Sequence, residues 1–178
     1  MGNIKTLLIP FGVNGIFFGE VMFTEITIAK MQDSDKNEYF EMSRDFYSLG
    51  VTNSQITDKG RECFWKEILS GEVVKAYILR CGGKTAGYAV CALSASQEAG
   101  GRVLWLDELY VKPQFRGKGA AKQFFKFIEL SDDYKIVRLE VELNNDKATK
   151  LYKSLGYKEV KYLQLYKKTN QSDTEELK

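Results

Sequence analysis

The chain has 178 residues, of which 44% are hydrophobic and 13% aromatic, so it can bury one good core without a second domain. Its 26 lysines and arginines nearly balance its 24 aspartates and glutamates, which is not the basic excess of a nucleic-acid-binding protein. No apolar run approaches the ~20 residues of a membrane-spanning helix. We therefore expect a cytoplasmic protein that binds neither nucleic acid nor membrane.

Histidine is absent, which removes the commonest general base and a common metal ligand. Acid–base chemistry must then use carboxylates, tyrosines, thiols, lysines or water, and a serine-triad hydrolase is excluded. The cysteines Cys63, Cys81 and Cys91 are odd in number and widely spaced, which argues against disulfides and against a zinc site. We expect all three to be buried, and we predict no metal.

Hydrophobic periodicity and turn signals predict an alternation of strands and helices. In chain order, the predicted elements are a strand at 23–30, a helix at 33–49 capped by Asp33 or Ser34, a helix at 57–69, strands at 73–80, 84–93 and 103–111, a helix at 120–129, a strand at 136–143, a helix at 145–155 and a last strand at 157–167. Gly82-Gly83 predicts a hairpin between the second and third strands.

The stretch from residue 106 to residue 121 carries the strongest functional signal. An apolar strand stops at Pro113, and a turn follows that contains two glycines, Gly117 and Gly119, and two cations, Arg116 and Lys118. An amphipathic helix opens directly behind this turn. The glycines allow close approach to the backbone, and the N-terminus of the new helix presents free N–H groups and positive charge. This order predicts a site for a pyrophosphate.

Two better-known phosphate loops do not fit this turn. A Walker A loop needs glycine where Lys112 stands and serine or threonine where Gly119 stands. The dinucleotide fingerprint needs a third glycine where Lys122 stands. The turn therefore belongs to neither class.

A second block follows downstream, where a strand leads into a helix that Asn144 or Asn145 can cap and that Gly156 stops. The sequence Asn-x-x-Ala-x-x-Leu-Tyr-x-x-x-Gly-Tyr spans residues 145–157, and Gln-x-Arg-Gly-x-Gly-Ala spans residues 114–120. Together they resemble the two motifs of the GCN5-related N-acetyltransferases. The sequence at residues 114–120 is similar to the family's acyl-coenzyme A loop. The resemblance covers residues 22–168.

This resemblance implies an α/β (α+β) GNAT-like fold: a central, mixed, mostly antiparallel twisted sheet with helices on both faces and splayed strands that form an acyl-coenzyme A cleft. It also implies acetyl-coenzyme A as cosubstrate. The pantetheine arm pairs with a strand edge, and main-chain donors hold the pyrophosphate. The implied cofactor-binding residues are Leu109, Tyr110, Val111, Gln114, Arg116, Gly117, Lys118, Gly119, Ala120, Ala121, Asn145 and Tyr152.

For catalysis, Tyr152 falls at the family position that often protonates the leaving thiolate, although a tyrosine packed in the core has the same spacing. Glu108 or Asp107 would be the base, and we prefer Glu108. Adjacent strand residues point to opposite faces, a bulge could exchange those faces, and both carboxylates could instead be solvated.

The function implied is an N-acetyltransferase that moves the acetyl group of acetyl-coenzyme A directly to a primary amine of a small molecule or peptide. Two alternatives stay open: a catalytically silent acyl-coenzyme A-binding module, and an acyltransferase with another acceptor. Aromatic and acidic residues in the two N-terminal helices are candidates for binding the acceptor. A homodimer also stays open.

We assign residues 22–168 to the catalytic domain and residues 169–178 to a polar tail. Residues 1–21 fit no predicted element, and we interpret them as a leader or a mis-called start. A signal peptide and an N-terminal myristoylation pattern at Gly2 are the competing interpretations.

Overall fold

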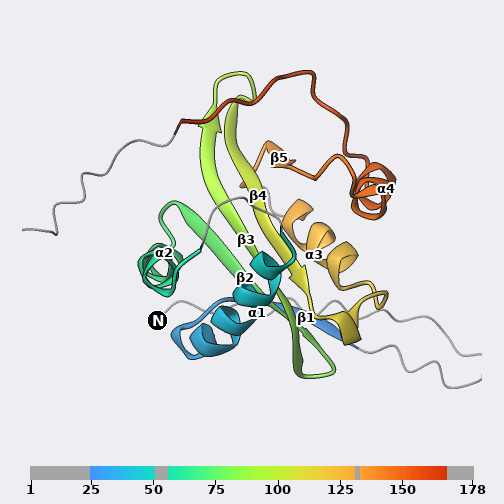
Figure 1. Cartoon of the computed structure of the whole chain (residues 1–178). Coiled ribbons are helices and arrows are strands. Elements are labelled where there is room, and N and C mark those ends of the chain that lie inside the picture. Colours follow the sequence, from blue (N-terminus) through green and yellow to red (C-terminus); the bar gives the residue numbers. More distant parts are fainter. Residues whose placement is uncertain (1–24, 51–55, 131–132, 168–178) are drawn as a thin grey trace, which may run out of the picture.

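The computed structural model describes residues 25–50, 56–130 and 133–167 (Figure 1). The elements in chain order are β1 (Ile26–Lys30), the 3-10 helix η1 (Asp33–Asp35), α1 (Lys36–Ser48), α2 (Asp58–Ser70), β2 (Val74–Cys81), β3 (Lys84–Ser96), β4 (Gly101–Val111), the 3-10 helix η2 (Pro113–Phe115), α3 (Ala120–Glu129), β5 (Ile136–Leu139) and α4 (Asp146–Ser154). The segments assigned above to a leader and to a polar tail lie outside the described residues.

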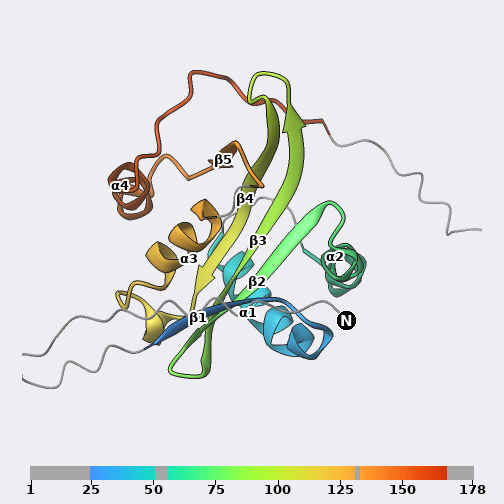
Figure 2. The ribbon, with the colours of Figure 1, turned by 180° about the vertical axis from the view of Figure 1, so that it is seen from behind.

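The five strands form one sheet in the order β1-β2-β3-β4-β5. Neighbouring strands are antiparallel except β4 and β5, which are parallel. The predicted mixed, mostly antiparallel sheet is thus confirmed, and so is the hairpin in which Gly82 and Gly83 join β2 to β3. The sheet is twisted from β1 to β5, as Figure 2 shows from behind.

Helices cover both faces of the sheet, as expected. On one face, Tyr39 and Met42 of α1 and Trp65 of α2 pack against strand residues such as Tyr88. On the other face, the apolar side of α3 packs against residues of β2, β3 and β4. Helix α4 lies outside α3, where the rings of Tyr152 and Phe125 are 5.5 Å apart. No residue of α4 is fully buried, so this helix sits at the margin of the core.

The end of the chain departs from the sequence-based expectation. The predicted strand at 157–167 is wrong, because these residues form no regular secondary structure. The predicted strand at 136–143 ends at Leu139. A strand needs a hydrogen-bonded neighbour, and none of the strand pairs among the described residues includes positions 140–143 or 157–167. The alternation of side chains therefore predicted one strand that is too long and one that does not form.

Two smaller expectations also need correction. Neither Asp33 nor Ser34 caps α1; instead, the carboxylate of Asp35 accepts a hydrogen bond from the N–H of Gln32, at 2.8 Å, and α1 starts at Lys36. Cys81 and Cys91 are buried as expected, but Cys63 is exposed on α2. No helix within the described residues is long and apolar enough to cross a membrane.

The approach of β3 to β4 requires a glycine at position 87. A Cβ atom there would lie less than 3.0 Å from the carbonyl oxygen of Tyr110, a distance that real Cβ atoms essentially never show. The obstacle is backbone on a neighbouring strand, so it cannot rotate away as a side chain would. Gly87 therefore holds β3 close to the end of β4.

We expect Gly87→Ala to lower the free energy of unfolding by ~1–3 kcal/mol, because the strands must separate to admit the methyl group. Urea unfolding measures the change. The matched control is Gly60→Ala in α2, where a Cβ atom meets only the Thr57 hydroxyl at 3.4 Å. This control should raise stability by ~0.5–1 kcal/mol, because alanine favours helices. Equal effects of the two substitutions would contradict the close-approach argument.

Candidate active site

Strand β4 contains a bulge at Asp107. Glu108 lies opposite Val90 of β3, and Leu106 lies opposite Cys91, so Asp107 is an extra residue without its own partner. The extra residue shifts the alternation of side chains. Leu106 packs with the core under α3, whereas Glu108 contacts Tyr88 on the face covered by α1. The exchange of faces that the sequence left open therefore occurs.

Glu108 is a buried carboxylate, only 4% exposed, that accepts two short hydrogen bonds. One comes from the hydroxyl of Tyr47 on α1, at 2.7 Å, and the other from the hydroxyl of Tyr88 on β3, at 2.6 Å. Burial raises the pKa of Glu108, and the two hydroxyl donors partly oppose this effect. Burial and the neighbouring Glu108 raise the pKa of both tyrosines, so each remains a protonated donor at neutral pH.

Asp107 has a different environment. The residue as a whole is exposed, yet burial of its carboxyl group raises its pKa, and the charge of Glu140 raises it further. Both candidate bases therefore hold a proton more tightly than an ordinary carboxylate does. Only Glu108 is held in one orientation by two hydrogen-bond donors.

Beyond the bulge, β4 has no partner on its β5 side within the described residues, since the pairing ends at Leu106 and Leu139. The N–H of Lys112 donates to the carbonyl of Ala86 on β3, at 2.8 Å. Backbone direction alternates along a strand, so Leu109 and Val111 turn their N–H and C=O groups to the opposite, unpaired edge. The carbonyl of Val111 accepts a hydrogen bond from Nε of Arg116 at 2.9 Å. The part of the chain that the structure describes offers no partner to the other groups of this edge.

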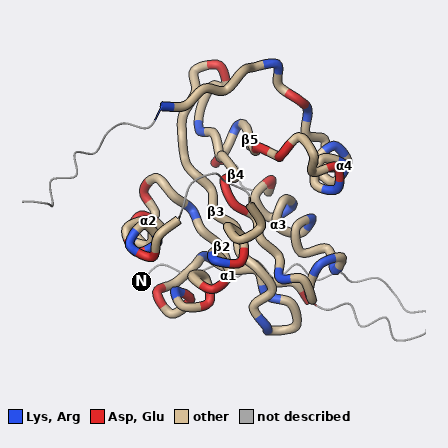
Figure 3. Tube along the Cα trace, in the orientation of Figure 1, with Lys and Arg blue, Asp and Glu red and all other residues tan. Residues whose placement is uncertain are grey.

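The loop between β4 and α3 supplies free donors and positive charge. Gly117 and Gly119 have φ angles of 77° and 85°, a left-handed conformation that favours glycine. Within the described residues, no hydrogen bond uses the N–H groups of Gly117, Lys118 or Gly119, and no side chain caps α3. Figure 3 shows cations along this loop and α3 and acids on β4. The predicted anion site is therefore chemically suitable.

The two cationic side chains of this loop lie near aromatic rings of the loop and of β4. The guanidinium of Arg116 lies 6.0 Å from the ring centre of Tyr110, and the ammonium of Lys118 lies 5.2 Å from that of Phe115. Gln114 is exposed, and Ala120 is buried where α3 meets the sheet. The donors of the loop are thus main-chain groups with two cations beside them.

Helix α4 brings the second motif to the outer side of α3. The side chain of Asn145 accepts a hydrogen bond from the N–H of Ala148 at 3.1 Å, which confirms its capping role. Tyr152 packs against Phe125 and Tyr157, and burial raises its pKa, so the phenol stays protonated. Among the described residues, no hydrogen bond or ring contact joins Tyr152 to Glu108.

Sequence reasoning missed the two hydrogen bonds that orient Glu108. Tyr47 belongs to the aromatic residues of the N-terminal helices for which acceptor binding was predicted, and no role was predicted for Tyr88. A signal was present, because Tyr88 stands among small residues in a buried strand, and a buried tyrosine hydroxyl needs a polar partner. The identity of that partner depends on the register of β3 with β4.

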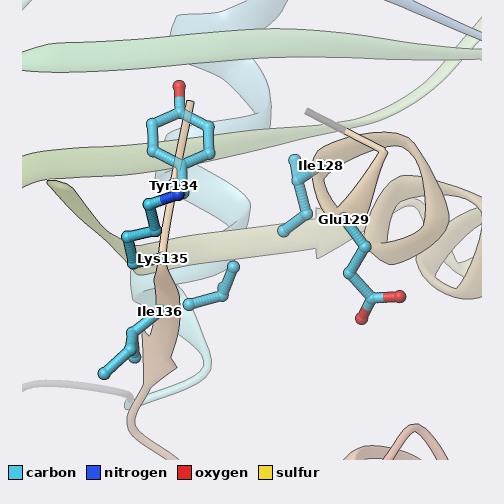
Figure 4. A pocket seen from close by; sticks show the side chains of 6 residues that line it. Ile128, Glu129, Tyr134, Lys135 and Ile136 are labelled. Carbon is cyan, nitrogen blue, oxygen red and sulfur yellow. The ribbon is translucent and has the colours of Figure 1, made fainter. Parts of the chain in front are cut away.

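A small pocket lies elsewhere, between the end of α3 and the start of β5 (Figure 4). Its lining consists of Ile128, Glu129, Tyr134, Lys135, Ile136 and Val137. None of these is a candidate site residue. The pocket therefore adds nothing to the catalytic arrangement around β4.

We expect Glu108→Gln to stabilise the protein at pH 8, by about 1.4 kcal/mol for each unit by which burial raises the pKa of Glu108. Ionising this buried group costs stability as pH rises from the ordinary glutamate pKa of 4.5 through the raised one, and glutamine avoids that cost. The gain in Tm should therefore vanish at pH 4. The control Glu98→Gln, at an exposed turn, should change neither value. A loss of stability at pH 8 would contradict the costly-carboxylate interpretation.

Comparison with known proteins agrees with this geometry. Residues 72–159 match the family model described as acetyltransferase (GNAT) domain. The sequence matches none of the curated proteins. Several solved structures share the fold at identities of 20% or less.

One such structure is a "possible acetyltransferase" from Clostridium difficile 630, with 20% identity, 82% of this chain and 98% of that chain covered, and a TM-score of 0.70. Another is AAC(6')-Iy in complex with the bisubstrate analog CoA-S-monomethyl-acetylneamine, with 18% identity, coverage of 83% and 100%, and a TM-score of 0.68. A third is ribosomal-protein-alanine N-acetyltransferase from Brucella melitensis biovar Abortus 2308, with 17% identity, coverage of 82% and 100%, and a TM-score of 0.64. With the family model matched over β2 to α4 and this fold, the chain belongs to the GNAT acetyltransferase family.

Proposed function

We propose that this protein transfers the acetyl group of acetyl-coenzyme A directly to a primary amine of a small molecule or peptide. The observation that carries the proposal is the unpaired edge of β4 at Leu109 and Val111, which leads into the uncapped start of α3. An extended amide-containing arm can pair with such an edge, and an anion can bind at such a helix start. Acetyl-coenzyme A contains both groups in one molecule.

The residues present fit this cosubstrate. The N–H groups of Phe115 and Arg116 are already bonded to carbonyls of residues 112 and 113, so the donors for the pyrophosphate are those of residues 117–121. Leu109 offers its N–H and C=O to the pantetheine amides, and Val111 offers its N–H. The Nε–H of Arg116 donates to the carbonyl of Val111, so the remaining guanidinium N–H groups are the ones that can reach the phosphates. The side-chain oxygen of Asn145 accepts the capping hydrogen bond from the N–H of Ala148, so its amide NH₂ is the group left to bind the cosubstrate.

When bound, acetyl-coenzyme A supplies an acetyl group activated as a thioester. Glu108 takes the proton that the attacking amine loses, directly or through a water, and its raised pKa makes it a better base than an ordinary carboxylate. Tyr47 and Tyr88 fix the orientation of Glu108 and remain protonated. Tyr152 donates its phenol proton to the departing thiolate, and its raised pKa keeps that proton available.

The proposed acceptor is a primary amine of either a small molecule or a peptide. The names of the similar structures point to different acceptors, a neamine derivative in one and a ribosomal-protein alanine in another. A panel of polyamines, aminoglycosides, amino acids and peptide N-termini, assayed by release of the free thiol, would identify the class. Binding without turnover on any amine would support the silent acyl-coenzyme A-binding module instead.

Acetyl-coenzyme A should stabilise the protein by ~2.7 kcal/mol at a hundredfold excess over its dissociation constant. Gly119→Glu should abolish this thermal shift, because it strains a left-handed position and places an anion at the pyrophosphate site. The control is Gly100→Glu in the β3–β4 turn, which carries the same strain, with φ of 68°, away from the site and should keep the shift. Absence of any shift with wild-type protein at millimolar cosubstrate would refute the proposed function.

Tyr152→Phe should lower kcat by ~10²–10⁴-fold while leaving the acetyl-coenzyme A shift intact, because only the proton donor is lost. The control is Tyr157→Phe, in the same ring cluster, whose hydroxyl is buried without a partner among the described residues. Equal kcat values for the two tyrosine variants would show that Tyr152 serves packing alone.

In wild-type protein, kcat/KM should rise with pH through a limb above the ordinary glutamate pKa of 4.5, and Glu108→Gln should remove that limb.

A further inference from the structure

Both carboxylate oxygens of Glu108 are occupied in this structure. Oε1 accepts a hydrogen bond from the hydroxyl of Tyr47 at 2.7 Å, and Oε2 accepts one from the hydroxyl of Tyr88 at 2.6 Å. The residue is 4% exposed, so little room is left for a third donor. A general base must lie within hydrogen-bond reach of the proton that it takes, directly or through one water. An acceptor therefore reaches Glu108 most directly by replacing one of these two phenols.

Tyr88 is the phenol that the fold holds in place. It belongs to β3, which lies between β2 and β4, and it is fully buried. Its ring packs against three other rings with centres 5.0, 6.4 and 5.9 Å away, those of Tyr39, Phe46 and Tyr110. Moving this side chain would leave a cavity in the core, which is costly. Tyr88 therefore keeps its hydrogen bond to Glu108.

Tyr47 is held at fewer points than Tyr88. It is the second-last residue of α1, it is only partly buried, and Leu49 just beyond it is 62% exposed. Within the part of the chain that the structure describes, its ring contacts one other ring, that of the adjacent Phe46 at 5.1 Å. A change of side-chain rotamer would carry its hydroxyl away from Glu108 without moving α1 or the sheet. Tyr47 is therefore the phenol that a ligand can replace.

The buried carboxylate of Glu108 lacks a cationic partner. None of the ion pairs among residues 25–50, 56–130 and 133–167 includes it. The ionisable groups that surround it come from four elements and include a single cation; they are Tyr39 and Tyr47 of α1, Tyr88 of β3, Asp107 of β4 and Arg61 of α2. Arg61 is already paired with Asp58, at 3.0 Å. The one cation nearby thus belongs to another ion pair.

A protonated amine would supply the missing positive charge. Hydrogen bonds from an ammonium to a carboxylate are roughly twice as strong as those between neutral groups. The Tyr47 hydroxyl lies near two carboxylates, since the charges of Glu108 and Asp107 both raise its pKa. An ammonium in its place would be attracted by both. The hydroxyl of an alcohol, in contrast, would only replace one neutral donor by another.

We propose that Tyr47 is a gating residue for the acceptor: a protonated amine displaces its hydroxyl from Oε1 of Glu108, while Tyr88 keeps the carboxylate in place. The exchange selects cationic amines against acceptors that carry only hydroxyl groups. From this position the ammonium can pass a proton to Glu108, as the proposed transfer requires. The inference rests on the proposed acetyl transfer and adds to it the residue that controls access to the base.

Steady-state kinetics with the best amine of the panel test the gate. We expect Tyr47→Phe to lower KM for the amine about five- to tenfold, because the amine no longer has to break a hydrogen bond to enter. The matched control is Tyr88→Phe, which removes the other donor of the same carboxylate. It should lower kcat, because the orientation of Glu108 is lost, and it should not lower KM. An unchanged or raised KM in Tyr47→Phe, or an equal fall of KM in both variants, would overturn the gate.

Fluorine NMR tests the displacement without turnover. The full-length protein is labelled with 3-fluorotyrosine, and the resonances of Tyr47 and Tyr88 are assigned with the two phenylalanine variants. Methylammonium chloride is the probe, because it is a small cationic amine, and sodium chloride at equal ionic strength and methanol are the controls. We expect the Tyr47 resonance to shift saturably with methylammonium alone and the Tyr88 resonance to stay in place.

The two measurements separate failure of the gate from failure of the proposed function. A Tyr47 resonance that does not move with methylammonium, or that moves equally with sodium chloride or methanol, would overturn the gate even if amines are acetylated. A selective shift of Tyr47 without acetylation of any amine would support the displacement and contradict the acetyl transfer.

Discussion

One extra residue in β4 determines the arrangement of the candidate site. The bulge at Asp107 turns Glu108 to the face covered by α1, where Tyr47 and Tyr88 donate to it. The same position marks the end of pairing with β5, at Leu106. A bulge disrupts the ladder locally and increases the twist of its strand, so both consequences have one cause. The buried carboxylate and the open strand edge are therefore adjacent along β4.

The buried carboxylate of Glu108 lowers the stability of the folded protein. A carboxylate that is 4% exposed loses most of its hydration, and two neutral phenols compensate less than a cation would. Tyr47 comes from α1 and Tyr88 from β3, so the docking of α1 on the sheet is what makes the buried charge tolerable. The hydroxyl of Tyr110 on β4 donates to Asp45 of α1, at 3.3 Å. This is a second polar contact between α1 and β4, beside the one from Tyr47 to Glu108. Burial raises the pKa of Glu108 and the two donors fix its orientation, and both properties suit the general base that we propose.

The parts of the fold that depend on local signals could be predicted from the sequence. The core strands, α3 and the cap at Asn145 each depend on residues a few positions apart. The strand at 157–167 could not be judged this way, because a strand exists only with a partner. In the site, the loop glycines were evident, whereas the donors to Glu108 were not. Tyr47 and Tyr88 are 61 and 20 residues away from it, and the bulge that turns Glu108 toward them depends on register.

The alternation along β4 also separates the two reactants that the proposed function requires. Leu109 presents backbone groups to the open edge, whereas Glu108, one residue earlier, presents its side chain to the α1 face. A cosubstrate paired along the edge and an amine reaching Glu108 from the α1 side would meet beside the bulge. Neither would have to leave for the other to bind. Direct transfer within a ternary complex therefore suits this geometry, since it needs no residue to carry the acetyl group between two separate sites.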